Sequence, residues 1–223
     1  MSQTAGHHRS RTGWISEHVY AVASAAVTFH VYIQGRDAVC VDAGMSPAAA
    51  RAALRRIGID TAAVSHVFLT HSDGDHVGGL PAFPEARVML PRAEEPTATG
   101  DRPRHILFLR RRNHLRAAWT PVDNGETIVA GEIRVRVVST PGHTQGSTSY
   151  LVNDEALFTG DLLTLRRGRA RPTPRLISED VEQGARSIAR LAAEVRHADL
   201  LCTAHSGYTS DYRSAMEGWR HGP

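Results

Sequence analysis

The sequence contains no lysine, few cysteines and no long apolar run. All 26 basic residues are therefore arginines, which we interpret as a codon bias and not as a functional feature. The two cysteines, Cys40 and Cys202, lie in separate apolar stretches, which excludes a disulfide framework and a cysteine-rich zinc module. No apolar stretch reaches about 18 residues, so no membrane-spanning helix is predicted. Residues 1–13 are polar and lack the apolar core of a secretion signal, so we expect a cytoplasmic protein.

The length and composition fit one globular domain. The chain has 223 residues, 41% of them hydrophobic and 22% charged, which is enough to bury a core and argues against disorder. No internal repeat or change of composition marks a linker. Residues 14–223 are therefore expected to form a single domain behind a flexible segment of residues 1–13. The 13 histidines are many for this length, and whether any of them is functional must be judged from its position in the sequence.

Strand-like runs alternate with helix-like segments along the chain, which predicts an α/β fold. Ser46 and Pro47 mark the start of one helix and Gly58 its end, while Ser178 is expected to cap a second helix. Residues 91–119 are expected to be irregular. The predicted strands cover residues 14–21, 26–33, 38–41, 64–70, 87–90, 127–128, 133–138, 147–152, 156–159 and 200–203.

The sharpest motif covers residues 70–79 and directly follows a predicted strand. It places four potential metal ligands within six residues, namely His71, Asp73, Asp75 and His76. Nitrogen and oxygen donors of this kind suit zinc, iron or manganese. Taken alone, the motif also fits a solvated polar loop.

Three further donors, His143, Asp161 and His205, each come directly after a predicted strand. Side chains that project from the same edge of a sheet can share one cleft. Seven donors are a sensible number for two metal ions when one carboxylate bridges them. The sequence therefore predicts a dinuclear metal site.

Together these motifs resemble the metallo-β-lactamase fold superfamily. The signature of that family is a His-x-His-x-Asp-His loop, followed by a distant histidine, a bridging aspartate and a last histidine. The resemblance runs from Asp42 to His205, with all elements in the family's order. It implies a four-layer αβ/βα sandwich of the α/β class, with metals at the edge where the two sheets meet.

The resemblance also implies a role for each donor. Two divalent metal ions would be bound, most simply zinc, with iron or manganese as alternatives. The first site would take His71, Asp73 and His143, the second would take Asp75, His76 and His205, and Asp161 would bridge both. Asp42 matches a family aspartate that lies behind the metals and orients their ligands. A carboxylate that caps a turn explains Asp42 equally well.

Asp73 departs from the family pattern, because the second histidine of the signature is an aspartate here. A carboxylate is a competent ligand, but it is shorter and harder than histidine and negatively charged. It therefore shifts the metal preference toward iron or manganese. Alternatively Asp73 fails to reach the metal, and the first site is weak or empty.

The implied chemistry is hydrolysis by a metal-activated hydroxide, which makes the protein a metallo-hydrolase. Asp75 would orient this nucleophile or collect its proton.

True β-lactamases of the family have Cys or Ser at the position of Asp161. Glyoxalase II has a helical domain after its last strands, for which the 18 residues after His205 are too few. Small ester-like substrates remain: lactones, thioesters or related acyl compounds.

Two alternatives to a hydrolase remain open. One is an iron-dependent oxygenase or redox enzyme on the same fold. The other is a non-catalytic protein with a degenerate metal site, for which Asp73 is the only support.

Arginines gather in residues 102–116 and again in residues 166–175, directly after Asp161. If the second segment lines the cleft, Arg166 and Arg167 would bind an anionic group of a small-molecule substrate. A solvated basic loop or a subunit contact is the alternative. No aromatic residues are interleaved with these arginines, so a nucleic-acid partner is not favoured. No membrane partner is expected, and a homo-oligomer is left open.

Overall fold

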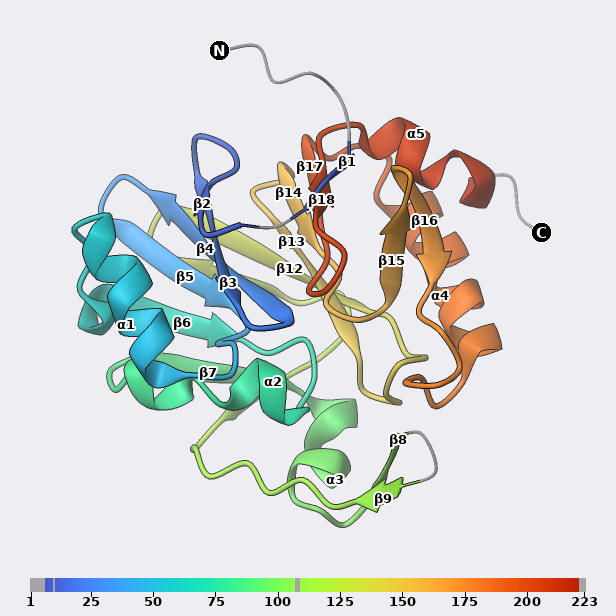
Figure 1. Cartoon of the computed structure of the whole chain (residues 1–223), viewed down its shortest axis with the longest axis horizontal. Coiled ribbons are helices and arrows are strands. Elements are labelled where there is room, and N and C mark those ends of the chain that lie inside the picture. Colours follow the sequence, from blue (N-terminus) through green and yellow to red (C-terminus); the bar gives the residue numbers. More distant parts are fainter. Residues whose placement is uncertain (1–6, 10, 107–108, 221–223) are drawn as a thin grey trace.

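The computed structural model describes residues 7–9, 11–106 and 109–220, which fold around two seven-stranded sheets (Figure 1). In spatial order the first sheet contains β10 (Thr120–Val122), β7 (Arg87–Pro91), β6 (Val64–Phe68), β5 (Asp37–Val41), β4 (Val27–Gln34), β3 (Val19–Ser24) and β2 (Gly13–Trp14). The second sheet contains β1 (His7–His8), β18 (Tyr208–Thr209), β17 (Leu200–Cys202), β14 (Ala156–Phe158), β13 (Thr148–Val152), β12 (Ile133–Ser139) and β11 (Thr127–Ala130). Two separate hairpins are formed by β8 (Arg104–Ile106) with β9 (Leu109–Arg111) and by β15 (Leu163–Arg166) with β16 (Arg169–Pro172).

Helices cover the outer face of each sheet. In Figure 1, α1 lies against the first sheet and α4 against the second. The α-helices are α1 (Pro47–Arg56), α2 (Gly74–Val77), α3 (Glu95–Ala98), α4 (Val181–Glu194) and α5 (Tyr212–Met216). Short 3₁₀ turns are η1 (Thr61–Ala63), η2 (Leu80–Ala82), η3 (Arg92–Glu94) and η4 (Glu217–Trp219).

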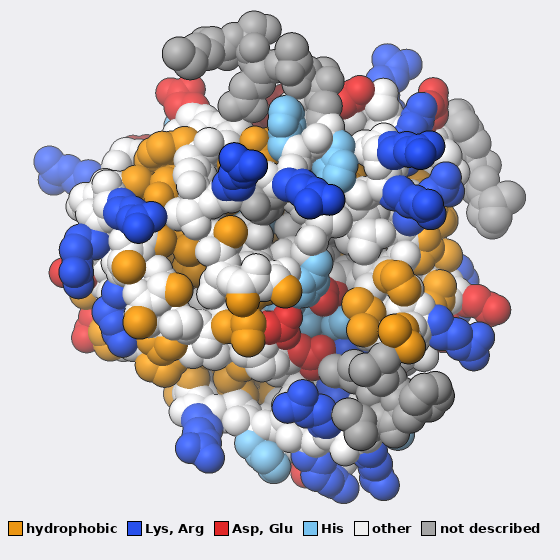
Figure 2. All heavy atoms as spheres, viewed as in Figure 1, with side chains coloured by type: hydrophobic (Ala, Val, Ile, Leu, Met, Phe, Trp, Pro, Cys, Tyr) orange, Lys and Arg blue, Asp and Glu red, His pale blue; other side chains and the backbone are white. Residues whose placement is uncertain are grey.

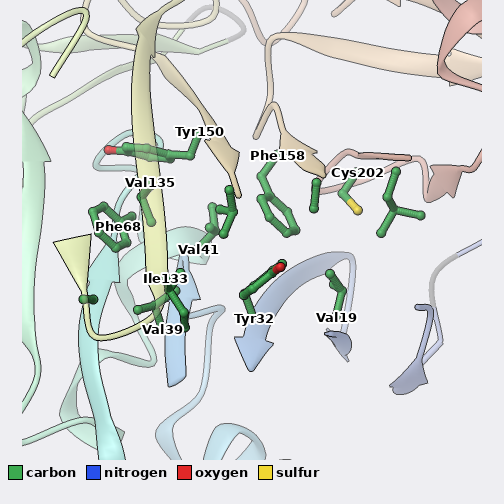
Figure 3. Close-up of a cluster of buried hydrophobic side chains, with 14 of the residues drawn as sticks. Val19, Tyr32, Val39, Val41, Phe68, Ile133, Val135, Tyr150, Phe158 and Cys202 are labelled. Atoms are coloured by element: carbon green, nitrogen blue, oxygen red, sulfur yellow. The ribbon is translucent and has the colours of Figure 1, made fainter. Parts of the chain in front are cut away.

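Three apolar clusters hold these layers together. The central cluster lies between the sheets and joins Val39 and Phe68 of the first to Ile133 and Phe158 of the second (Figure 3). A second cluster packs α1 on the first sheet, and a third packs α4 on the second sheet. The order helix, sheet, sheet, helix confirms the predicted four-layer αβ/βα sandwich.

The first predicted helix is confirmed, and its start follows from its sequence. The Ser46 hydroxyl accepts a hydrogen bond from the Ala49 amide at 3.3 Å, and Pro47 is the first helical residue. Both features satisfy or remove amide donors that the first turn leaves unpaired. Ala50, Ala53 and Leu54 face the sheet and are buried.

Several local expectations differ from the structure. Asp180, not Ser178, caps α4, since its carboxylate accepts from the Gln183 amide at 2.8 Å. Residues 91–119, expected to be irregular, contain η3, α3, β8 and β9. Residues 166–175, expected to form a loop, belong largely to the β15–β16 hairpin.

The N-terminal segment also takes part in the fold. Residues 1–13 were expected to be flexible and separate from the domain, but β1 pairs with β18, so His7 lies opposite Thr209. Residues 1–6 and 10 of that segment lie outside the described residues. Across the described ranges no helix is long and apolar enough to cross a membrane.

The sheet topology brings the predicted donors to one edge. Strands β5 and β6 run parallel, so Asp42 and the motif that begins at Thr70 leave the first sheet at the same end. In the second sheet β14 and β17 are also parallel, which places Asp161 beside His205. Because the carboxyl ends of parallel strands meet at the same edge, residues distant in sequence become neighbours.

Gly79 permits a close approach of two loops at this edge, and we predict that an added side chain there is destabilising. A Cβ atom on Gly79 would lie 1.9 Å from the Ala43 carbonyl oxygen. Gly79→Ala should therefore lower the free energy of unfolding by about 1–3 kcal/mol, with a fall in melting temperature of about 2–4 °C for each kcal/mol. Gly74→Ala is the matched control, because its Cβ would meet nothing within 4 Å. Equal thermal stability of the two variants would contradict this account of Gly79.

Candidate metal centre

The structure brings all seven predicted donors together at the edge shared by the two sheets. We call this set the metal centre; it comprises His71, Asp73, Asp75, His76, His143, Asp161 and His205. Three groups of three donors can be distinguished, and within each group the three ligand atoms lie within 4.8 Å of one another. The groups are His71–Asp73–His143, His71–His76–Asp161 and Asp75–His76–His205. Figure 2 shows histidine and acidic side chains gathered near the middle of the face drawn.

Asp42 lies behind the metal centre and fixes the ring of His76. Its Oδ2 atom is 2.8 Å from His76 Nδ1, and its Oδ1 atom accepts from the Thr70 amide at 2.8 Å. The residue adopts φ of 62°, a left-handed conformation that costs free energy for a side chain other than glycine. The contact with Nδ1 leaves Nε2 of His76 directed toward Asp75 and Asp161. This geometry is compatible with the orienting role that the resemblance implies, and the bond to the Thr70 amide is compatible with the alternative of a turn cap.

Two other histidines are oriented in the same way. His71 Nδ1 lies 3.0 Å from the Thr70 hydroxyl, and His205 Nδ1 lies 2.7 Å from the carbonyl oxygen of Ala26. In each ring the Nδ1 atom is thus bound outside the centre, so Nε2 is the atom available to a metal. The arrangement is the one expected of metal-binding histidines, whose second nitrogen is held by a hydrogen bond.

Several buried polar atoms in the metal centre have no hydrogen-bond partner among the described residues. They include Nε2 of His71, Nε2 of His76 and Oδ1 of Asp161. Buried polar atoms are normally paired, and leaving one unpaired is costly. The orphaned atoms converge, and nitrogen and carboxylate donors are those that zinc and related metals bind. The residues therefore fit a metal ion.

Asp161 is the central carboxylate of the set. It approaches His76 through Oδ1 at 3.5 Å, and His143 and His205 through Oδ2 at 3.5 and 3.1 Å. Burial alone would raise the pKa of Asp161, but His76 and His143 hold that pKa well below its usual range. Asp161 therefore lies between the two predicted sites, because its Oδ2 atom approaches His143 of the first and His205 of the second. Its role as a bridging ligand stays a prediction.

Asp75 is the most accessible carboxylate of the metal centre. Its side chain is 34% exposed, and its Oδ2 atom lies 3.4 Å from His205 Nε2 and 3.7 Å from His76 Nε2. It therefore lies where solvent or a substrate can reach the donors. A pocket of about 540 Å³ is lined by His205, Ser206 and Leu165, among others, so it reaches the metal centre at His205.

Asp73 is engaged by an arginine that the sequence did not single out. Arg104 is fully buried, and its Nε and Nη2 atoms donate to the two oxygens of Asp73 at 3.0 and 2.9 Å. Its Nη2 atom also lies 2.9 Å from His143 Nε2, and Nη1 donates to Glu179 at 3.2 Å. Burial alone would raise the pKa of Asp73, but His143, His71 and Arg104 hold it far below its usual range.

Glu94 is a second functional residue that the sequence did not reveal. This buried carboxylate accepts from the Ser72 amide at 3.1 Å and hydroxyl at 2.7 Å, and from the Thr144 hydroxyl at 2.7 Å. It thus joins the loop that carries His71 to the loop that carries His143. Neither Glu94 nor Arg104 lies in a recognisable motif. When one glutamate or arginine lies among many other charged residues, the sequence does not reveal that its side chain is buried.

Arg166 and Arg167 are not drawn into the metal centre. Both are exposed at the turn of the β15–β16 hairpin, where Arg167 has φ of 52°. The preceding residue, Leu165, donates its amide to Ser206 at 2.7 Å and lines the pocket beside His205. Neither Arg166 nor Arg167 is among the residues that line this pocket, and their role in binding a substrate stays a prediction.

The family can now be decided from the comparison with known proteins. The family model described as the metallo-beta-lactamase superfamily matches residues 26–216. The chain belongs to this superfamily. The match includes every donor of the metal centre, and the superfamily is the one that the sequence motifs resemble.

Several curated relatives of this superfamily member are named hydroxyacylglutathione hydrolase. The protein of that name from Vibrio parahaemolyticus serotype O3:K6 (strain RIMD 2210633) is 30% identical over 190 residues, which are 82% of this chain and 64% of that protein. The one from Methylococcus capsulatus (strain ATCC 33009 / NCIMB 11132 / Bath) is 29% identical over 191 residues, 84% of this chain and 66% of that protein. The chain thus spans less than two thirds of their length. Hydroxyacylglutathione hydrolase is glyoxalase II, the branch that the sequence did not favour for this chain because too few residues follow His205.

Solved structures of the superfamily share the fold. A structure described as the first B3 metallo-beta-lactamase with an active site glutamic acid aligns with a TM-score of 0.72 at 19% identity, covering 93% of this chain and 85% of that chain. A metallo-beta-lactamase family protein from Thermus thermophilus gives 0.67 at 24% identity, covering 92% of this chain and 79% of that chain. Identities this low support the fold alone.

We predict that Asp42→Asn weakens metal binding, because it removes the charge that orients His76. Loss of such a supporting group typically lowers metal affinity about 10–100-fold. Asp123→Asn is the control, since it removes the same charge from an exposed pair with Arg92 and should have little effect. Titration of metal-free protein with Zn²⁺ measures both. Equal affinities would mean that Asp42 only caps its turn.

Proposed function

We propose that this protein is a metal-dependent hydrolase of small acyl substrates, with thioesters as the first class and lactones or other esters as the second. One observation carries the proposal: Asp75, His76, Asp161 and His205 lie together, Nε2 of His76 and Oδ1 of Asp161 have no hydrogen-bond partner among the described residues, and His205 also lines a pocket. The names of the curated relatives support the choice of thioesters. Zinc is the proposed metal, and two ions are what the sequence predicts.

A divalent metal bound by these donors would lower the pKa of a water molecule and polarise an acyl carbonyl. The chain's own groups supply the remaining requirements. Asp161 and His205 would hold the ion at the mouth of the pocket, and Asp42 would keep His76 aimed at it through the contact of 2.8 Å. These side chains are positioned before substrate arrives, so little reorganisation is needed.

Asp75 is the proposed proton acceptor. Its carboxylate is accessible, whereas Asp161 is nearly fully buried and Asp73 is bonded to Arg104. A general base must lie within hydrogen-bond reach of the proton that it removes. Asp75 meets this requirement for a water held between His76 and His205, since it lies close to the Nε2 atoms of both rings.

The adjoining pocket is suited to a small acyl group. Its lining combines the apolar side chains of Ala26 and Leu165 with the polar Thr28 and Ser206, and Arg9 lies at the same opening. Arg166 and Arg167 follow Leu165 directly along the chain. A substrate with an anionic group remote from the scissile bond would place that group near these arginines.

Removal of the metal should abolish thioester hydrolysis and lower the melting temperature. Anything that binds the folded chain alone stabilises it, and the donors tie residues 71–76 to residue 205 across both sheets. The measurement compares chelator-treated protein with the same sample after readdition of Zn²⁺, on thioester, lactone, phosphodiester and β-lactam substrates. Undiminished thioester turnover in verified metal-free protein would rule out the proposed function. Iron as the metal bound to protein that is purified without added metal would instead favour the oxygenase or redox alternative over a zinc hydrolase.

The double variant Arg166→Ala with Arg167→Ala should raise KM for a carboxylated thioester several-fold and leave kcat and the KM of a small neutral thioester unchanged. Loss of contacts made equally to substrate and transition state has this kinetic pattern. The effect should diminish at high salt, because exposed charges are screened over about 10 Å at 0.1 M. A variant with Arg55→Ala and Arg56→Ala, at the end of α1, is the matched control. If charged and neutral substrates respond alike, the two arginines do not contact the substrate.

A further inference from the structure

We propose that the Arg104 guanidinium takes the place of the first metal ion, so that each chain binds one metal ion, in the half of the centre formed by Asp75, His76, Asp161 and His205. The inference rests on the proposed function, since it concerns the same metal centre. It differs from the dinuclear site that the sequence predicts, and the contacts of Arg104 carry it.

Two of the three donors of the first site, Asp73 and His143, already contact the guanidinium, whereas Nε2 of His71 has no hydrogen-bond partner among the described residues. In His143 the Nε2 atom, which faces the first site, lies 2.9 Å from Nη2 of Arg104 and 3.2 Å from Oδ2 of Asp73. A metal ion would have to approach the same nitrogen to about 2.0–2.1 Å, so it would displace the guanidinium from this contact. Asp73 is engaged as well, because both of its oxygens accept from the guanidinium, at 3.0 and 2.9 Å.

The positive charge of Arg104 also disfavours a metal ion in the first site. An arginine stays protonated in proteins, so Arg104 brings a permanent positive charge into a buried position. Asp73 supplies the matching negative charge in the bidentate geometry typical of arginine and carboxylate. A divalent cation at the same donors would face the guanidinium at close range in a medium of low dielectric constant, where like charges repel strongly.

Arg104 is also held from the side opposite to Asp73. Its Nη1 atom donates to Glu179 at 3.2 Å, directly before α4, and its Nη2 atom lies 3.4 Å from the Ile177 carbonyl oxygen. Asn113 adds a bond of 3.2 Å from its Nδ2 atom to Asp73 Oδ1. Movement of the guanidinium out of the site would break several charge-assisted hydrogen bonds at once.

Arg104 makes no hydrogen bond to the second half of the centre among the described residues. The hydrogen bonds of Arg104 go to Asp73, His143, Glu179 and Ile177. Three or four protein ligands with one open position for water are what a catalytic zinc site needs. Arg104 is therefore a positioning residue that fixes Asp73 and His143, and its effect on metal content is the property to measure.

The experiment measures zinc bound per chain. Metal-free protein is dialysed against Zn²⁺, passed through a desalting column and analysed for its metal content, together with its thermal unfolding. The parent should hold one ion per chain. Arg104→Ala combined with Asp73→His, which gives the first site three histidines, should hold two, a twofold increase. Arg102→Ala should stay at one, since Arg102 bonds Thr97 and Ala93, outside the centre.

Asp73→Asn tests the inference without the loss of the buried arginine. The carboxamide keeps the shape of Asp73 and is a much poorer metal ligand, so zinc content should stay at one ion per chain. Two ions in the parent would overturn the inference, as would a fall in zinc content of Asp73→Asn. A folded Arg104→Ala, Asp73→His variant that still holds one ion would overturn it too.

These outcomes separate this inference from the proposed function. A parent that holds two ions and hydrolyses thioesters overturns the single-ion inference and leaves the hydrolase in place. A parent that holds one ion and hydrolyses none of the substrates overturns the proposed function and leaves the single-ion inference in place.

Discussion

The metal centre depends on one buried carboxylate at the end of a strand. Asp42 accepts hydrogen bonds from the first residue of the histidine-rich motif and holds the ring of His76. These bonds lock the chain after β5 to the chain after β6, so the motif leaves the sheet in a fixed direction. The strained φ of 62° is tolerated because two parallel strands and their shared core over-determine this position.

The balance of charge explains the remaining architecture of this edge. Asp73, Asp75, Asp161 and Glu94 gather there, and so many carboxylates cannot share a partly buried site without compensation. Hydroxyl and amide donors satisfy Glu94, a guanidinium satisfies Asp73, and the converging histidines surround Asp161. Glu94, Asp73 and Asp161 are thus each satisfied by a different kind of partner, while Asp75 is partly exposed to solvent, which makes the two halves of the centre unlike.

The fold and the seven donors could be predicted from sequence because their signals are local. A donor directly after an apolar run reveals both the strand and the edge at which it ends, as for His143 and Asp161. Arg104 and Glu94 could not be found in this way. Arg104 lies among arginines that are mostly exposed, and its burial results from a partner 31 residues away. The cap of α4 at Asp180 was missed because Ser178, two residues earlier, is an equally good cap by residue type.

The ion pair between Asp73 and Arg104 also constrains how this chain can evolve. Replacement of one partner alone strands a buried charge, which typically costs about 3–5 kcal/mol, a large part of a total stability of about 5–15 kcal/mol. The two residues are therefore expected to be replaced together, or one at a time only in a protein stable enough to tolerate the loss. Among descendants of a common ancestor, a histidine at position 73 should be inherited with an uncharged residue at position 104. The identity of residues 73 and 104 would thus separate relatives with this ion pair from relatives with a histidine at position 73, even where overall sequence identity does not.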